Sequence, residues 1–196
     1  MNRPAYLLNK TGHLNLTATV YQDELVAKCR EGDKYSFELL YRKYAKPMFN
    51  TSLRILNNRA DVEDVLQEAF VAAFRLDQFD YTSTFGAWLK RIVINKSIDL
   101  LRRRKLTIVD IEDAATDNFI ESDLNEEESS TLKVEQVKQA VIKLPSGYRT
   151  VLSLFLFEGY DYEEIAEIMH ISSTTVRTQY HRAKQKLLQL MQKGGT

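Results

Sequence analysis

Two stretches of the chain are dense in basic side chains, the residue type that binds polyanions. Lys90–Lys105 holds seven Lys or Arg residues against one acid, and Arg177–Lys193 holds five and no acid. Clustered Lys and Arg form the electrostatic footprint of a nucleic-acid-binding surface. Basic residues also gather at helix C-termini, where the helix dipole favours them, and this explanation competes for either stretch alone. Two such stretches, each beside a recognisable pattern, favour nucleic acid.

The spacing in the first stretch suggests how bases and phosphates could be held. Arg91, Asn95 and Arg102 are spaced i, i+4 and i+11, and a helix would place them on one face. A guanidinium there can hold a phosphate, while an Asn amide offers a donor and an acceptor to a base edge. Trp88 could stack on an unpaired base. Its place on the apolar stripe of the same helix favours an ordinary core residue instead.

The second stretch continues a helix-turn-helix pattern over residues 161–188. Asp161 and Glu164 form a capping-box pair at the start of the first helix, and Ser172 is the expected cap of the second. The turn is expected at His170. The second helix has a regular inner stripe: Val176, Tyr180, Ala183 and Leu187. Its outer face carries short polar residues and Arg, which suit readout in the major groove: Thr174, Arg177, Thr178 and His181, with Arg182 and Lys184 at the edges.

Upstream of both motifs, the apolar spacing predicts helices over 23–30, 33–56, 61–75 and 84–103. Pro47 should kink or break the second of them. Asp61 is the expected N-cap of the third. Asp61, Asp64, Gln67 and Glu68 lie off its apolar stripe. This acidic face could dock a basic partner, although periodicity alone favours a solvated surface.

Charge divides the chain into parts. The 196 residues contain 27 basic and 27 acidic side chains, yet residues 107–131 carry a net charge of −9 while residues 21–106 carry +4 and 132–196 carry +3. The acidic strip lacks periodicity and is typical of an extended, self-repelling linker. Together with further helices expected at 132–143 and 147–157, this predicts an all-α fold: two small helical domains, 21–106 and 132–193, joined by a flexible acidic linker and preceded by an unassigned arm, 1–20.

Composition also excludes several classes of protein. A single Cys leaves no intrachain disulfide and no cysteine zinc cluster. The apolar runs are too short to span a bilayer, and no secretory signal precedes them, so we expect a soluble cytoplasmic protein without membrane insertion. Enzymatic use of carboxylates such as Asp61, Glu63 and Asp64 finds no support, because no nucleophile–base pair, glycine-rich phosphate loop or metal spacing accompanies them. We therefore expect no catalytic residue, metal or cofactor.

Three stretches in order resemble the extracytoplasmic-function (ECF) sigma factors of bacterial RNA polymerase, in the sigma-70 family. They are DVEDVLQEAFVAAFR, FGAWLKRIVINKSIDLLRRR and LPSGYRTVLSLFLFEGYDYEEIAEIMHISSTTVRTQYHRAKQKLL. The resemblance covers residues 21–193 and implies region 2, a linker and region 4. It implies a non-enzymatic transcription initiation factor. Its partners would be core polymerase (β′ clamp helices and β flap) and promoter DNA, and the family commonly has an anti-sigma factor.

The resemblance also implies roles for matching residues. The acidic face of Asp61, Asp64, Gln67 and Glu68 would dock the β′ clamp helices. The melted −10 element would be captured by Trp88, Arg91, Asn95, Lys96 and Arg102, with Asn95 lining the pocket for a flipped base. The −35 element would meet Arg149, Ser172, Thr175, Arg177, Thr178, His181 and Arg182. The acidic linker would follow the RNA path of the polymerase.

Two features depart from the family pattern. His170 stands where the turn usually has Gly, so a left-handed backbone there would be strained. Gln179 replaces a basic residue that is common after the position of Thr178. The alternative to a sigma factor is a stand-alone helix-turn-helix regulator whose first domain senses a signal or dimerises. That alternative predicts binding to a palindromic operator without polymerase, whereas a sigma factor alone should bind DNA weakly.

Overall fold

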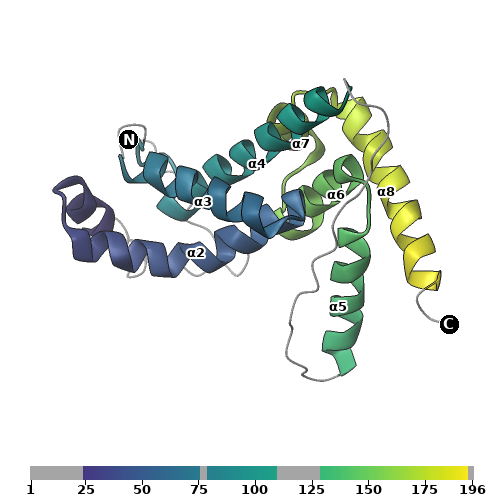
Figure 1. Cartoon of the computed structure of the whole chain (residues 1–196), viewed down its shortest axis with the longest axis horizontal. Helices are drawn as coiled ribbons and strands as arrows, with labels where there is room; N and C mark the ends of the chain where they lie inside the picture. Colours follow the sequence, from purple (N-terminus) through teal and green to yellow (C-terminus); the bar gives the residue numbers. More distant parts are fainter. Residues whose placement is uncertain (1–23, 76–78, 110–128, 194–196) are drawn as a thin grey trace, which may run out of the picture.

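The computed structural model describes residues 24–75, 79–109 and 129–193, and these are helical apart from short connections (Figure 1). A short helical segment at 24–30 precedes α2 (Lys34–Leu56), α3 (Arg59–Phe74) and α4 (Phe85–Val109). The remaining elements are α5 (Ser129–Ile142), α6 (Ser146–Ser153), the π-helical turn η2 (Leu154–Glu158), α7 (Tyr162–Met169) and α8 (Ser173–Lys193). The predicted all-α fold with two helical domains is confirmed.

The expected arm, 1–20, and most of the expected linker, 107–131, lie outside the described residues. The helices on either side extend into the expected linker range: α4 ends at Val109, and α5 begins at Ser129. Within the described ranges, no helix is long and apolar enough to cross a membrane.

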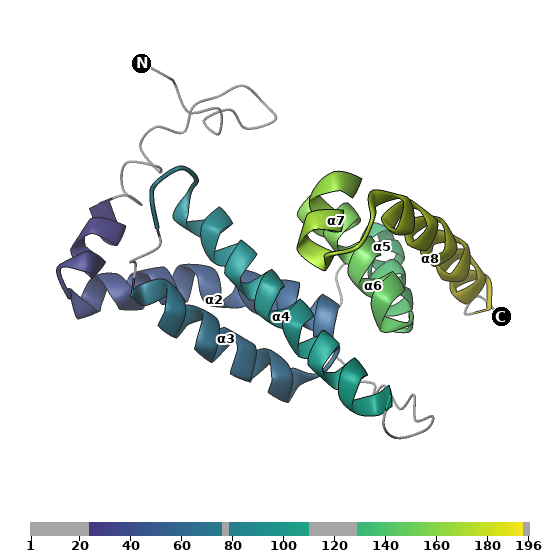
Figure 2. The same cartoon turned by 90° about the horizontal axis from the view of Figure 1, so that it is seen from above.

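The first domain is a bundle in which α2, α3 and α4 all contact one another (Figure 2). Its core includes Leu40, Val65, Phe70 and Leu89, which the helical spacing placed inward, and also Val93, which it did not. Burying such a stripe drives the association of amphipathic helices.

Two local predictions in this domain need correction. Pro47 was expected to kink or break α2, and it does not break it: the helix continues through Pro47 to Leu56. The N-cap of α3 is Asn58 rather than Asp61: its side-chain oxygen accepts a hydrogen bond from the Asp61 amide at 3.2 Å. The helix therefore begins at Arg59, and Asp61 lies inside its first turn. Asn58 is as good a cap as Asp, so the residue types alone did not separate the two starts.

The close approach of α2 and α4 depends on Gly86. A Cβ atom at this position would lie 2.6 Å from Cε1 of the buried Tyr44 ring. We expect Gly86→Ala to lower the free energy of unfolding by about 1–3 kcal/mol through overpacking, measured by urea denaturation. Gly147→Ala is the matched control, because its Cβ would meet only Gln179 Oε1 at 3.7 Å. Equal stability of the two variants would contradict the packing argument.

The second domain contains the predicted helix-turn-helix. Asp161 Oδ1 accepts a hydrogen bond from the Glu164 amide at 2.8 Å, and Glu164 Oε2 accepts one from the Asp161 amide at 2.8 Å, which confirms the capping box. His170 ends α7 with φ 48°, in the left-handed region expected for it. Ser172 caps α8 by accepting a hydrogen bond from the Thr175 amide at 3.1 Å. These caps fix where the second helix begins.

The two domains pack directly against each other, with α6 between the end of α2 and α8 (Figure 1). One apolar cluster includes Ile55 and Ile94 of the first domain together with Val151, Leu154 and Ile165 of the second. We call this packing the closed arrangement. It brings side chains of the second domain against the basic face of α4.

Candidate nucleic-acid interface

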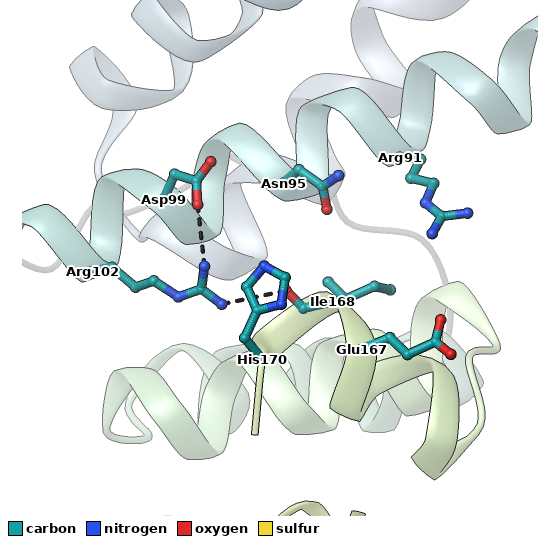
Figure 3. Close-up of a pocket in the computed structure, with 7 residues that line it drawn as sticks. All are labelled: Arg91, Asn95, Asp99, Arg102, Glu167, Ile168 and His170. Atoms are coloured by element: carbon teal, nitrogen blue, oxygen red, sulfur yellow. Dashed lines mark hydrogen bonds and ion pairs between the residues drawn. The ribbon is translucent and has the colours of Figure 1, made fainter. Parts of the chain in front are cut away.

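Arg91, Asn95 and Arg102 of α4 line a single cavity of about 410 Å³, as their spacing predicted. Its opposite wall comes from the second domain: Glu167, Ile168 and His170, at the end of α7 (Figure 3). Figure 3 shows Asn95 and Arg91 projecting toward that wall. In the closed arrangement the end of α7 thus faces these α4 residues across the cavity, while Arg91 and Asn95 remain exposed.

Arg102 joins the two walls. It forms an ion pair with Asp99 at 3.2 Å and donates a hydrogen bond to the carbonyl of Ile168 at 3.4 Å (Figure 3). The carbonyl belongs to the last turn of α7, where the final acceptors of a helix need partners from outside. Arg102 is therefore engaged within the protein in this arrangement.

Lys96 and Trp88 lie outside this cavity. The Lys96 ammonium lies 2.9 Å from Glu68 of α3, and this contact holds the pKa of the Glu68 carboxyl below its usual range. Trp88 is half-buried against Phe79 and Phe85, with ring centroids 5.1 and 5.8 Å away. The structure gives Trp88 the core position that its stripe favoured, and its contact with DNA stays a prediction.

Only part of the predicted acidic face is exposed. Asp64, Gln67 and Glu68 are exposed on α3. Asp61 is buried, with 9% of its surface accessible, and pairs with Arg104 of α4. Its expected place on the solvent face is therefore wrong. The reason lies in tertiary packing: Asp61 faces a cation on a helix 43 residues further along the chain.

The predicted −35 residues on α8 form an exposed face. Thr175, Arg177, Thr178, His181 and Arg182 are all exposed, as is the capping residue Ser172. Arg177 pairs with Glu163 of α7 at 3.1 Å and lies over the Tyr162 ring. This exposed ion pair is weak enough for a phosphate to displace it.

Arg149, assigned to the same DNA surface, is instead fully buried at the domain junction. Its guanidinium donates hydrogen bonds to the carbonyl of Ile55, at the end of α2, at 3.4 and 3.3 Å. It also donates to the carbonyls of Ile142 at 3.2 Å and Leu144 at 2.9 Å. DNA cannot reach it in the closed arrangement. A side chain with five donors fits here because two helix ends present unpaired carbonyls.

Glu158, which the sequence analysis did not select, is a buried carboxylate with partners from the first domain. Its oxygens lie 2.5 Å from Arg54 and 2.8 Å from Lys90, and Oε1 accepts a hydrogen bond from Thr51 at 2.9 Å. Burial raises the pKa of Glu158, but the Lys90 and Arg54 donors outweigh burial, and the pKa lies below its ordinary value. The one signal in the sequence is an acid that ends the apolar run LSLFLF.

The described residues hold no group of three or more His, Cys, Asp or Glu side chains that could bind a metal. The site as a whole consists of a basic α4 face that lies opposite the end of α7, an exposed polar face on α8, and ionic contacts between the domains.

Comparison with known proteins identifies the family. Residues 40–107 match the model of sigma-70 region 2, and residues 134–187 match that of sigma-70 region 4. The RNA polymerase sigma-H factor of Pseudomonas aeruginosa is 35% identical over 185 residues, which cover 89% of this chain and 96% of the relative. The chain belongs to the sigma-70 family. The ECF sigma factor SigW of Bacillus subtilis is 32% identical over 172 residues, covering 83% and 92%. This sigma factor is thus an ECF member that acts in transcription initiation, in a non-enzymatic family.

Solved sigma-factor structures resemble this one. CnrH, in complex with the cytosolic domain of CnrY, has a TM-score of 0.52 and 27% identity, covering 87% of this sigma factor and 97% of CnrH. RpoE of Bartonella quintana, in complex with the anti-sigma factor NepR, has a TM-score of 0.56 over 80% of this chain and 96% of RpoE; at 23% identity it supports the fold alone. Region 2 corresponds to α2–α4 and region 4 to α5–α8.

Proposed function

We propose that this sigma factor docks on core RNA polymerase through region 2, captures the melted −10 strand on α4 and reads the −35 duplex with α8. The observation that carries the proposal is the shared cavity of Arg91, Asn95 and Arg102 on the basic helix. We propose domain boundaries of 21–106 for region 2, 107–131 for the linker and 132–193 for region 4. The protein would act in the cytoplasm, where its polymerase is.

The α4 face suits an unpaired strand. Asn95 is exposed between two arginines on one face, so its amide can pair with a base edge while a guanidinium holds the neighbouring phosphate. Unstacking a base costs a few kcal/mol, which such contacts can offset. Lys96, next to Asn95, would add a phosphate contact once it leaves Glu68.

The α8 face suits the major groove. Its first exposed turns carry Thr and Arg side chains on a capped helix, the arrangement through which recognition helices contact base edges. Arg149 could join this surface only if the domains separate, because it is buried in the closed arrangement.

The core-binding surface would combine polar and apolar contacts. Gln67 lines a groove between α2 and α3 together with the exposed Tyr41 and Val71, and Asp64 and Glu68 are exposed on the same helix, α3. An apolar groove with a polar rim is the composition of a specific protein interface. We propose that the β′ clamp helices dock here and that the β flap meets region 4. An anti-sigma partner is a further proposal, supported by the structural relative CnrH, which is 27% identical and is in complex with the cytosolic domain of CnrY.

Run-off transcription with purified core polymerase tests this function. We expect the sigma factor to bind core enzyme and to direct discrete new start sites on a library of genomic promoter fragments, while binding the same fragments weakly on its own. Weak binding alone follows because the polymerase supplies the effective concentration that couples two modest contacts. Tight binding to a palindromic site without core enzyme, and no new starts, would support the stand-alone regulator instead.

A further inference from the structure

The side chain of Glu158 lies in a basic site of region 2. It is 4% exposed, although it belongs to region 4, and its three hydrogen-bonding partners belong to α2 and α4. The cavity around it has a volume of about 460 Å³ and is also lined by Lys46. Three cations thus surround one carboxylate, which leaves the site with an excess of positive charge.

The donors of this site exceed what a carboxylate uses. Arg54 Nε is buried and has no hydrogen-bond partner among the described residues, while Thr51 and the Arg54 terminal nitrogen share Glu158 Oε1. A phosphodiester has more acceptor oxygens than a carboxylate and carries the same charge. Arg, Lys and Thr side chains are the usual donors to backbone phosphates. The site therefore matches a phosphate at least as well as it matches Glu158.

The position of this site along α4 is also compatible with a DNA strand bound at Asn95. Lys90 precedes Asn95 by five residues on α4, which is about 7.5 Å along a helix axis. That length corresponds to about one or two nucleotides, because the stacked spacing in a duplex is 3.4 Å and an unstacked strand is longer. A strand whose base reaches Asn95 would therefore have a phosphate near Lys90 and the α2 residues beside it.

We propose that region 2 contains a binding site for a DNA backbone phosphate, formed by Thr51, Arg54 and Lys90 with Lys46 at its edge, and that Glu158 occupies this site in the closed arrangement. The inference rests on the proposed function, since it assumes that a strand follows α4. DNA would displace the carboxylate and, with it, the α7 turn that faces Asn95. Entry of the strand and separation of the domains would then be one event.

The test uses the full chain and a fluorescein-labelled oligo-dT of about 12 nucleotides, within the usual footprint of single-strand binding. Anisotropy is measured over a salt series. Because phosphate contacts carry no sequence information, the test needs no known promoter. We expect Glu158→Gln to tighten binding on the order of tenfold, the scale of one charge-assisted contact. Glu38→Gln is the matched control, since it releases Arg42 on the surface of α2 by the same charge change.

Second substitutions separate a phosphate site from a simple contact between domains. In the Glu158→Gln background, Lys90→Gln should remove most of the gain and reduce the salt slope by about 0.7, the value for one single-strand phosphate. Lys46→Gln should also weaken binding and reduce the salt slope. Lys46 forms no ion pair with Glu158 among the described residues, so this substitution leaves those ion pairs intact. Double variants that bind as tightly as Glu158→Gln would overturn the proposal, as would the absence of any gain. Run-off transcription by the wild type reports separately on the proposed function.

Discussion

Replacing Arg149 with Met is expected to lower the free energy of unfolding by about 3–5 kcal/mol, the cost of removing one partner from a buried charged network. The loss should appear as a melting temperature lower by about 10 °C in circular dichroism. The reason is that three carbonyls, of Ile55, Ile142 and Leu144, would lose their donor inside the protein. Met fills similar volume but donates nothing.

Arg42→Met provides the control, because Arg42 is exposed on α2 and, within the described residues, pairs with the exposed Glu38. Its effect should stay within about 0.5 kcal/mol, as is usual for surface changes. Arg149→Lys should recover only part of the loss, since an ammonium lacks the planar fork that reaches two helix ends at once. If Arg149→Met were as stable as Arg42→Met, the hydrogen bonds of Arg149 would not stabilise the domain junction. The prediction that Arg149 contacts DNA would then be favoured again.

Arg149 also shows what the sequence could and could not predict. Helices, stripes and caps follow from neighbours within about four residues, which is why Val176, Ala183 and the Asp161–Glu164 pair were predicted correctly. Arg149 reaches the carbonyl of Ile55, 94 residues away, and Glu158 bonds Thr51 and Arg54, 107 and 104 residues away. No local pattern encodes such a contact, because it depends on how the two helical domains pack against each other.

Distant contacts also explain why the position of Asp61 was predicted wrongly. Periodicity placed it on the solvent side of α3, yet the side of a helix that faces solvent is set by whatever packs on it, here α4 and Arg104. By contrast, Asp64, Gln67 and Glu68 remain exposed, although Glu68 pairs with Lys96 at the edge of α4. A binding face predicted from one helix is thus correct only where no second helix covers it.

The closed arrangement exposes the two proposed DNA surfaces to different degrees. The α8 face is exposed, whereas the α4 face with Arg91 and Asn95 looks onto α7 (Figure 3). Under the proposed function, this state leaves the −35 surface open and places α7 opposite the surface for the melted strand. Binding the −35 duplex before the melted strand is useful, because a single strand exists only after the polymerase has opened the duplex. It also means that any −10 defect must be measured where the domains have separated.

Asn95→Ala should therefore leave the isolated protein nearly unchanged and impair initiation strongly. Asn95 is exposed, lines the cavity and makes no hydrogen bond through its side chain within the described residues. Its loss should therefore change the free energy of unfolding by less than about 0.5 kcal/mol. In the polymerase complex the amide would lose its pairing with an unstacked base, worth about 1–3 kcal/mol. Open-complex formation should then fall by about 10- to 100-fold, measured as run-off transcripts.

Core binding separates this effect from misfolding. Asn95→Ala should bind core polymerase like the wild type, because the proposed docking groove lies between α2 and α3, away from this face of α4. Gln189→Ala, an exposed amide near the end of α8, should alter neither measurement. If Asn95→Ala lost core binding and transcription together, Asn95 would support the domain rather than the strand. If it lost neither, the base contact would have to come from another residue of the cavity, with Arg91 the first to test.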